Sequence, residues 1–274
     1  MRMTNDSTLT LNPGFGPLPI AYFDRDGSRT PVLFVHGLGN AASNFEDTLA
    51  ARPLAGHRLI ALDLPGCGAS PYPRTTRLDI DGVVKVVAAF VEAIDPPPFL
   101  IVGASLGGLV SLLYAERHPD RLVGFLNVEG NLAPEDCMFS RLVVSQPYEE
   151  FARTVLPEIK RSVAAKAGRG FAKHLEVLER ADLRAYYDYS FQTVEYSDNG
   201  GLLDRFLSLS IPVHFVYGSV NRGLTYLPRL RASRCTVTEI GDADHFLFYD
   251  APEAFAECVR RSAGAGAGLE PGRS

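Results

Sequence analysis

Short apolar runs recur along the chain, and each of them ends at glycine or at a polar residue. They are rich in β-branched side chains and almost continuously hydrophobic, which is the pattern of strands buried on both faces of a parallel sheet. We therefore predict strands at residues 32–35, 58–62, 99–102, 122–128, 213–217 and 235–240.

Longer segments with apolar residues at helical spacing lie between these runs. The clearest is 79–94, and 106–117 follows the same pattern. Residues 252–261 open with proline, which the first turn of a helix tolerates. Strands that alternate with helices predict an α/β fold, with a mostly parallel sheet, right-handed crossovers and flanking helices.

Two internal regions depart from this alternation. Residues 9–24 are predicted to form an antiparallel hairpin at the leading edge of the sheet. Residues 131–210 separate the fourth and fifth parallel strands, and a structureless loop of that length is uncommon in a compact domain. We predict a small helical cap there, with helices at 149–167 and 171–189.

The C-terminal segment 263–274 is a low-complexity sequence with few apolar side chains, so we expect it to be disordered. The chain is then divided into three parts. The predicted core comprises residues 1–130 and 211–262, and the predicted cap comprises residues 131–210.

Composition and charge exclude several classes of function. The chain has 27 Lys and Arg against 32 Asp and Glu, a net charge of −5, and no dense basic cluster, so neither nucleic acid nor an anionic membrane surface is an expected partner. No apolar run approaches the roughly 18 residues that a membrane span needs. The N-terminus lacks the apolar core of a secretory signal.

The cysteines add information about the compartment. No two of them form a CxxC pair, and their wide spacing predicts free thiols rather than a disulfide framework or a zinc site. We expect a cytoplasmic protein on this basis. The four positions are Cys67, Cys137, Cys235 and Cys258.

One glycine-rich loop allows a cofactor interpretation. Residues 37–42 match G-x-G-x-x-A directly after a predicted strand. Asp63 ends the next strand, near the spacing of about 20 residues at which a ribose-binding carboxylate is found. The pattern is that of a dinucleotide site, but it explains nothing further along the chain.

A second glycine-rich segment, Gly103-Ala104-Ser105-Leu106-Gly107, favours nucleophilic chemistry. It is G-x-S-x-G between a buried strand and a helix, the context of a nucleophile elbow. The sharp turn would expose the Ser105 hydroxyl and direct the Leu106 N–H toward a developing oxyanion. The structural alternative is a glycine-rich turn in which the serine only caps the helix.

Two further segments support the catalytic interpretation. Residues 36–39 (HGLG) match a loop that supplies a second oxyanion N–H, here from Leu38. His245 follows the last predicted strand, where a catalytic base would meet Ser105. His36 is expected to brace its own loop. The remaining histidines are assigned to the surface or the core: His57, His118, His174 and His214.

With these motifs the chain resembles the α/β-hydrolase superfamily over roughly residues 18–130 and 211–262. The segments that carry the resemblance are HGLG, DLPGCGAS at 63–70, GASLGG at 103–108 and the histidine in DADHF. They occur in the order expected for the superfamily. They also account for Asp63 and the first glycine-rich loop, so the dinucleotide interpretation is set aside.

The acid of the implied triad departs from the common pattern. Most similar proteins carry it after the strand that ends here at Gly218, typically where this chain has Asn221. Glu129 ends the preceding strand, and a minority of the superfamily, including haloalkane dehalogenases, is similar in this respect. Their nucleophile is an aspartate, so Ser105 argues against dehalogenation. The alternative role for Glu129 is a structural carboxylate in an ion pair.

The resemblance implies a serine hydrolase that uses Ser105, His245 and Glu129, with no metal or organic cofactor, on a small molecule with an ester, thioester or lactone group. Acyl transfer, ring formation, carbon–carbon bond hydrolysis and a non-catalytic ligand-binding role remain open. Aromatic residues of the cap would mostly pack against the sheet, and some would line an apolar pocket. They are Phe139, Tyr148, Phe151, Phe171, Tyr186, Tyr187, Tyr189 and Phe191.

Overall fold

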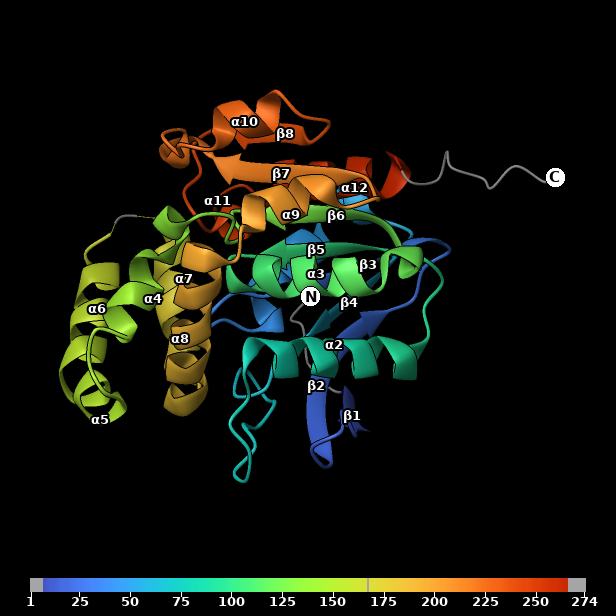
Figure 1. Cartoon of the computed structure of the whole chain (residues 1–274). Coiled ribbons are helices and arrows are strands. Elements are labelled where there is room, and N and C mark those ends of the chain that lie inside the picture. Colours follow the sequence, from blue (N-terminus) through green and yellow to red (C-terminus); the bar gives the residue numbers. More distant parts are fainter. Residues whose placement is uncertain (1–6, 167, 266–274) are drawn as a thin grey trace.

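The computed structural model describes residues 7–166 and 168–265, and it contains one eight-stranded sheet with the order β1-β2-β4-β3-β5-β6-β7-β8 (Figure 1). Strand β2 is antiparallel to β1 and β4, and all other neighbours are parallel. The predicted hairpin and the predicted parallel strands are therefore confirmed. The strands are β1 Ser7–Leu11, β2 Leu18–Arg25, β3 Arg29–Val35, β4 His57–Leu62, β5 Phe99–Ala104, β6 Leu122–Val128, β7 Val213–Gly218 and β8 Thr236–Ile240.

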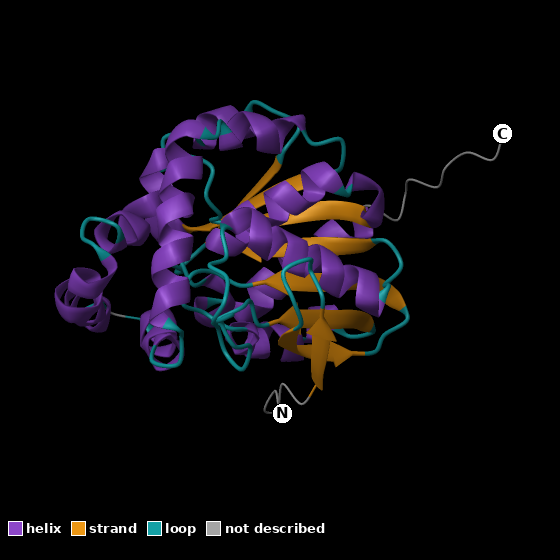
Figure 2. Cartoon of the chain, turned by 60° about the horizontal axis from the view of Figure 1, so that its bottom comes forward, coloured by secondary structure: helices purple, strands orange, loops and turns teal. Residues whose placement is uncertain are grey.

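Helices cover both faces of this sheet (Figure 2). Helices α2, α3 and α9 pack on one face, whereas α1, α11 and α12 pack on the other. The helices of these layers are α1 Glu46–Ala50, α2 Ile80–Ile94, α3 Leu106–Arg117, α9 Leu202–Ser208, α10 Leu227–Arg231, α11 Leu247–Asp250 and α12 Pro252–Ala265.

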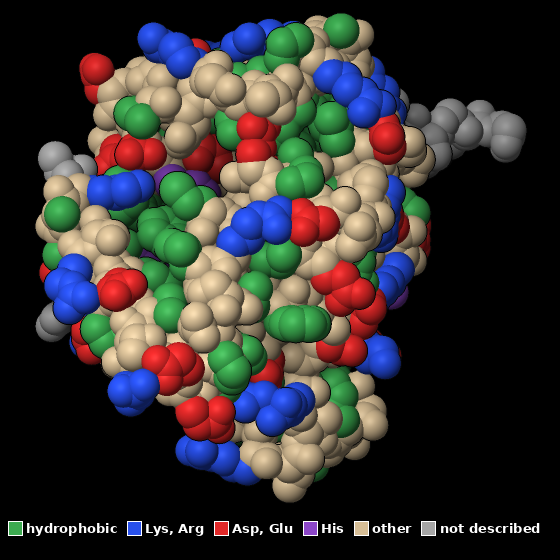
Figure 3. All heavy atoms as spheres, turned by 60° about the vertical axis from the view of Figure 1, so that its left-hand side comes forward, with side chains coloured by type: hydrophobic (Ala, Val, Ile, Leu, Met, Phe, Trp, Pro, Cys, Tyr) green, Lys and Arg blue, Asp and Glu red, His purple; other side chains and the backbone are tan. Residues whose placement is uncertain are grey.

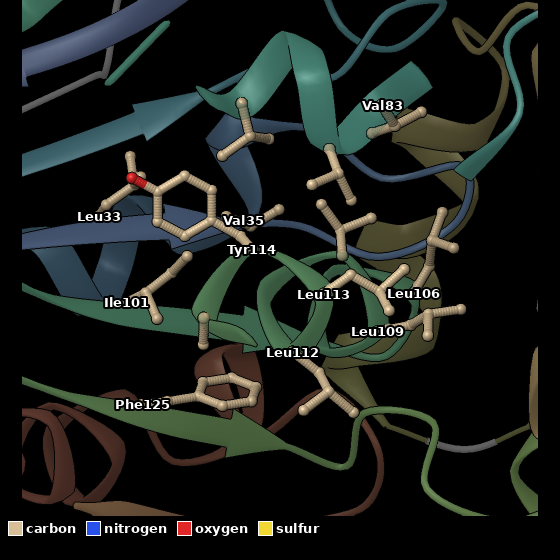
Figure 4. Packing of buried hydrophobic residues seen from close by; sticks show 14 of the residues in the cluster. Leu33, Val35, Val83, Ile101, Leu106, Leu109, Leu112, Leu113, Tyr114 and Phe125 are labelled. Atoms are coloured by element: carbon tan, nitrogen blue, oxygen red, sulfur yellow. The ribbon is translucent and has the colours of Figure 1, made fainter. Parts of the chain in front are cut away.

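The alternation of side chains along each strand divides the core into two layers. On β3, Leu33 and Val35 belong to the layer under α2 and α3, whereas Val32 and Phe34 belong to the opposite layer. Helix α3 is buried over almost its whole length because it lies between the sheet, α2 and α9. Its leucines pack against Leu33, Val35 and other strand residues (Figure 4).

The segment between β6 and β7 contains α4 Met138–Val143, α5 Tyr148–Glu150, α6 Leu156–Ala164, α7 Arg169–Leu178 and α8 Leu183–Asn199. We call these five helices the insertion helices. They lie together at one end of the strands, on the left of Figure 1. Their description as a separate cap remains a prediction.

The prediction of one continuous helix over 171–189 is wrong, because two helices, α7 and α8, occupy this range. The chain turns between α7 and α8, and the Asp182 carboxylate accepts hydrogen bonds from the Arg184 and Ala185 N–H groups at 2.8 and 3.2 Å. An aspartate at this position stabilises the first turn of a new helix, so α8 begins there. The predicted helix 149–167 is helical from Tyr148 to Ala164 and includes a π-helical turn at Phe151–Val155 between α5 and α6.

The predicted boundary of the C-terminal tail at Ala263 is too early. Helix α12 continues to Ala265, and the Ala263 side chain is fully buried. The rest of the predicted tail, residues 266–274, lies outside the described residues. Within the described ranges, no helix has the length and apolar character that a membrane span requires.

Candidate active site

Ser105 occupies a strained turn between β5 and α3. Its φ of 52° and ψ of −122° are values that a residue with a side chain adopts at a cost of order 1–3 kcal/mol. The turn is anchored by the Ser105 N–H, which donates to the Val128 carbonyl at 3.1 Å, and by the Gly108 N–H, which donates to the Ser105 carbonyl at 2.8 Å. The sharp elbow predicted from G-x-S-x-G is therefore present.

The glycines around Ser105 are required by close backbone contacts. A Cβ at Gly107 would lie 2.1 Å from the Val35 carbonyl oxygen, and one at Gly103 would lie 2.4 Å from the Gly107 carbonyl oxygen. A Cβ at Gly37 would lie 3.0 Å from the Ser105 Cβ. The loop after β3 is thus pressed against the nucleophile elbow, and its Leu38 lines the same cavity as Leu106.

His36 and Asp63 hold this loop in place. His36 Nδ1 lies 2.8 Å from the Gly37 carbonyl oxygen, and its Nε2 accepts a hydrogen bond from the Leu64 N–H at 3.0 Å. Burial lowers the pKa of His36, which keeps the ring in the neutral form that this arrangement needs. The Asp63 carboxylate accepts hydrogen bonds from the Ala42 and Ala69 N–H groups, both at 2.8 Å. It therefore shapes two loops, which supports setting aside a ribose-binding role.

Glu129 and His245 meet at the carboxyl ends of the strands. His245 Nδ1 lies 2.8 Å from Glu129 Oε2, and the Glu129 side chain is buried. Burial alone would lower the pKa of His245, but the hydrogen bond and negative charge of Glu129 raise it above its ordinary value. Glu129 itself has a φ of 43°, so a second strained residue stands beside the elbow.

Asn221 accounts for the unusual position of the carboxylate. Its Nδ2 lies 3.0 Å from each oxygen of Glu129 and 3.3 Å from Asp244 Oδ1. The Gly218 N–H adds a hydrogen bond to Glu129 Oε1 at 2.7 Å. An amide at position 221 can donate to both carboxylates, whereas a third carboxylate would repel them. Asp244 Oδ1 accepts the backbone N–H of His245 at 2.7 Å.

A cavity of about 150 Å³ joins these groups. Ser105, Glu129 and His245 line it, together with Leu38 and Leu106. In the space-filling view, histidine atoms are visible in a hollow on this side of the molecule, between acidic and hydrophobic side chains (Figure 3). The structure thus brings all five predicted site residues to one cavity. Their catalytic roles remain proposals.

The insertion helices contribute a small part of their aromatic residues to this cavity, namely Phe139, Phe171 and Tyr186. Phe151 is fully buried and stacks on Tyr186, with ring centroids 6.1 Å apart and planes 4° apart. Phe191 is 59% exposed. Five of the eight predicted aromatic residues therefore do not line the cavity, and one of these five, Phe191, is exposed rather than packed.

Several cavity residues could not be found from the sequence, and two of them, His174 and Asp136, are ionisable groups with shifted pKa values. His174, which was assigned to the surface or core, is buried on α7 and lines the cavity. Asp136 also lines it, and burial raises its pKa to about 6. Neither residue belongs to a local motif, because each reaches the cavity through the packing of the insertion on the sheet.

Comparison with protein-family models places residues 32–258 in the "Alpha/beta hydrolase family". This chain belongs to that family. The predicted superfamily is confirmed, and the protein is a hydrolase.

Similar proteins include esterases. A pimeloyl-[acyl-carrier protein] methyl ester esterase from Neisseria meningitidis serogroup C is 29% identical over 257 residues, which cover 84% of this chain and 91% of that protein. The enzyme of the same name from Chromobacterium violaceum is 39% identical over 97 residues, 35% of each chain.

Solved structures share the fold over nearly the whole length. A thermophilic esterase from Thermogutta terrifontis has a TM-score of 0.77 at 19% identity, with 95% of this chain and 98% of that chain covered. The N-acyl homoserine lactonase AidH has a TM-score of 0.72 at 19% identity, with coverage of 97% and 99%. At these identities the structures support the fold alone.

Proposed function

We propose that this protein is a serine hydrolase that cleaves an ester, thioester or lactone through an acyl-enzyme on Ser105. The observation that carries the proposal is the 2.8 Å contact between His245 and Glu129 beside a strained Ser105 in one cavity. A serine hydroxyl becomes a nucleophile when a nearby histidine can take its proton and a buried carboxylate orients that histidine.

In the first half of the reaction, Ser105 Oγ attacks the acyl carbon and passes its proton to His245 Nε2. Glu129 accepts the Nδ1–H, which fixes the tautomer and stabilises the imidazolium. The N–H groups of Leu38 and Leu106 would bind the oxyanion of the tetrahedral intermediate, and loss of one such donor costs about 3–4 kcal/mol in comparable enzymes. The imidazolium then protonates the leaving alkoxide or thiolate as the acyl–oxygen or acyl–sulfur bond breaks, which gives an alcohol or a thiol.

In the second half, water attacks the acyl carbon of the Ser105 ester. His245 removes a proton from that water and returns it to Ser105 Oγ as the acyl–serine bond breaks. The products are a carboxylic acid and the free enzyme. In this proposal the chain itself supplies the nucleophile, the base and the acid, and water is the only co-reactant.

The relatives' names support an ester among these substrates, since two of them are methyl ester esterases. The cavity adds apolar surface from Met138, Phe139 and Phe171, which suits a small acyl substrate with an apolar portion. We further propose a cytoplasmic location without nucleic-acid or membrane partners. The four cysteines support a reducing compartment, because all of them are buried free thiols.

The test uses p-nitrophenyl butanoate as an activated ester and a fluorophosphonate as a covalent serine label. Wild type should hydrolyse the ester and take up one label. Ser105→Ala should lose labelling and lower kcat by several orders of magnitude while keeping its fold, because loss of a triad residue leaves only about 10³–10⁴-fold acceleration over water.

Ser208→Ala is the matched control, since Ser208 is an exposed serine on α9 whose hydroxyl donates to the Asp204 carbonyl oxygen of the same helix. It should label and turn over like wild type. If Ser105→Ala keeps more than about a tenth of the wild-type kcat, Ser105 is not the nucleophile.

A further inference from the structure

A second histidine lies at the catalytic cavity, and the proposed reaction does not use it. His174 comes from α7, is 5% exposed and lines the cavity with Ser105 and His245. Its ring stacks on Phe246, with centroids 4.9 Å apart and planes 26° apart. His174 Nδ1 lies 2.7 Å from Asn40 Oδ1.

The position of the proton on His174 follows from a chain of hydrogen bonds. The Ala41 backbone N–H can only donate, and it donates to Asn44 Oδ1 at 2.9 Å. Asn44 must then present Nδ2 to Asn40, whose Oδ1 accepts it at 2.9 Å. Because that Asn40 atom is an acceptor, His174 Nδ1 carries the proton and donates to it.

His174 Nε2 therefore keeps its lone pair. Among the described residues no group donates to this atom, and the ring borders the cavity. Burial, together with the positive charge of His245, lowers the pKa of His174 to about 4, so the ring stays neutral near pH 7. In the described chain the fully buried side-chain atoms without a partner are Ser111 Oγ and Asn127 Nδ2, so Nε2 of His174 is open to the cavity, where a donor that enters with the ligand can reach it.

The place of His174 relates it to the reacting carbonyl. The Phe246 ring contacts His174 on its face and His245 at an edge, with centroids 5.3 Å apart in the second pair. Asn40 follows Leu38 by two residues in the predicted oxyanion loop. His174 thus shares the Phe246 ring with the proposed base and contacts the proposed oxyanion loop through Asn40, so it borders the part of the cavity where the reacting carbonyl would bind.

We propose that His174 is a specificity-determining residue whose Nε2 accepts a hydrogen bond from an O–H or N–H group of the bound substrate. The substrate class is an acyl compound that carries such a donor near its reacting carbonyl, for example a hydroxy acid ester or an N-acylamino ester. This inference rests on the proposed serine hydrolase function. A site built around an unpaired acceptor discriminates against analogues that lack the donor.

The probes are p-nitrophenyl esters of 2-hydroxybutanoate, 3-hydroxybutanoate and N-acetylglycine. Each is compared with a counterpart that lacks the donor: butanoate, the O-methyl ethers, and N-acetylsarcosine. Wild type should hydrolyse at least one donor ester with a kcat/KM about tenfold above that of its counterparts, the factor that one net hydrogen bond supplies.

Two variants separate recognition from structure. His174→Asn keeps an amide N–H where Nδ1 stood, so it can still donate to Asn40, but it removes the acceptor at the Nε2 position. His174→Gln places an amide oxygen near the Nε2 position and gives up the bond to Asn40. We expect the ratio of kcat/KM between a donor ester and its counterpart to fall to about one in His174→Asn and to persist in part in His174→Gln.

The opposite ranking, with Asn like wild type and Gln impaired, would assign His174 a purely structural role and overturn the proposal. A wild type with no donor preference in any pair would overturn it as well. Fluorophosphonate labelling of Ser105 distinguishes these outcomes from failure of the proposed function: an enzyme that labels and hydrolyses every ester alike loses only the His174 inference, whereas one that does neither loses both.

Discussion

The loops at the carboxyl edge of the sheet and the insertion helices build the same cavity in different ways. The edge supplies Ser105, Glu129 and His245, and it concentrates backbone strain: of the non-glycine residues with positive φ in the described chain, Ser105, Glu129 and Asp242 lie in these loops. The insertion has relaxed helical backbone and contributes side chains through packing. In the proposed function, strained turns at the edge of the sheet hold the reacting groups, and the packed helices contact the substrate.

The comparison implies that substitutions at the two regions have different consequences. Groups at the edge touch one another within hydrogen-bond distance, so a change there should alter kcat. Some residues of the insertion line the cavity and, in the proposed function, contact the substrate, so a change there should alter KM or discrimination among substrates.

The largest effect after loss of the nucleophile is expected at Glu129. Its partners His245 Nδ1, the Gly218 N–H and Asn221 Nδ2 are all donors, and a glutamine offers only one acceptor oxygen to them. Glu129→Gln should keep the shape, favour the wrong imidazole tautomer and lower kcat by about 10³–10⁴. Steady-state kinetics with p-nitrophenyl butanoate measures this.

Asp244→Asn is the control for that variant, because Asp244 accepts the backbone N–H of His245 and not its ring. Its kcat should fall far less than that of Glu129→Gln. The assignment of the acid is wrong if the Gln variant is close to wild type while Asp244→Asn is inactive, although the hydrolase function would survive that result.

A second, smaller effect is expected at Asn221, and its sign should depend on residue 129. In the wild-type background, Asn221→Asp sets a third carboxylate against Glu129 and Asp244, and we expect kcat/KM to fall about tenfold or more. In the Glu129→Gln background the same change restores an acid at the commoner position and should raise kcat. Equal effects in both backgrounds would mean that residue 221 does not share the carboxylate site.

These residues also show how far the sequence can predict this molecule. The strands and the elbow at Ser105 follow from local constraints, since G-x-S-x-G records contacts within a few residues of the turn. Glu129 could be predicted from the sequence because it ends a predicted strand. His174 was not, because its role depends on how α7 packs over a loop 134 positions earlier in the chain. The break at 179–182 was missed although aspartate favours helix starts, because Leu178, Ala181 and Ala185 continue the helical spacing across it.

The pH dependence should distinguish the base from other titrating groups. Attack by Ser105 requires neutral His245, and Glu129 raises the pKa of that histidine. A plot of kcat/KM against pH should therefore rise with an apparent pKa above the ordinary histidine value. Activity falls about tenfold per pH unit below that pKa. In Glu129→Gln the residual activity should show this rise at lower pH. Asp136, with a pKa of about 6, is the competing group, and a rise that vanishes in Asp136→Asn would belong to it.

The smallest effects are expected in the insertion, at Phe171 and Phe191. Phe171 lines the cavity and is 3% exposed, whereas Phe191 is 59% exposed on α8. Phe171→Leu removes aromatic contact with the substrate but keeps an apolar side chain, so KM for p-nitrophenyl butanoate should rise a few-fold, by about 1 kcal/mol, with kcat nearly unchanged. Phe191→Leu should leave both constants unchanged, because surface substitutions usually stay within about 0.5 kcal/mol. A fall in kcat at Phe171 with constant KM would mean that the insertion takes part in the chemistry, and would break the division of labour between the two regions.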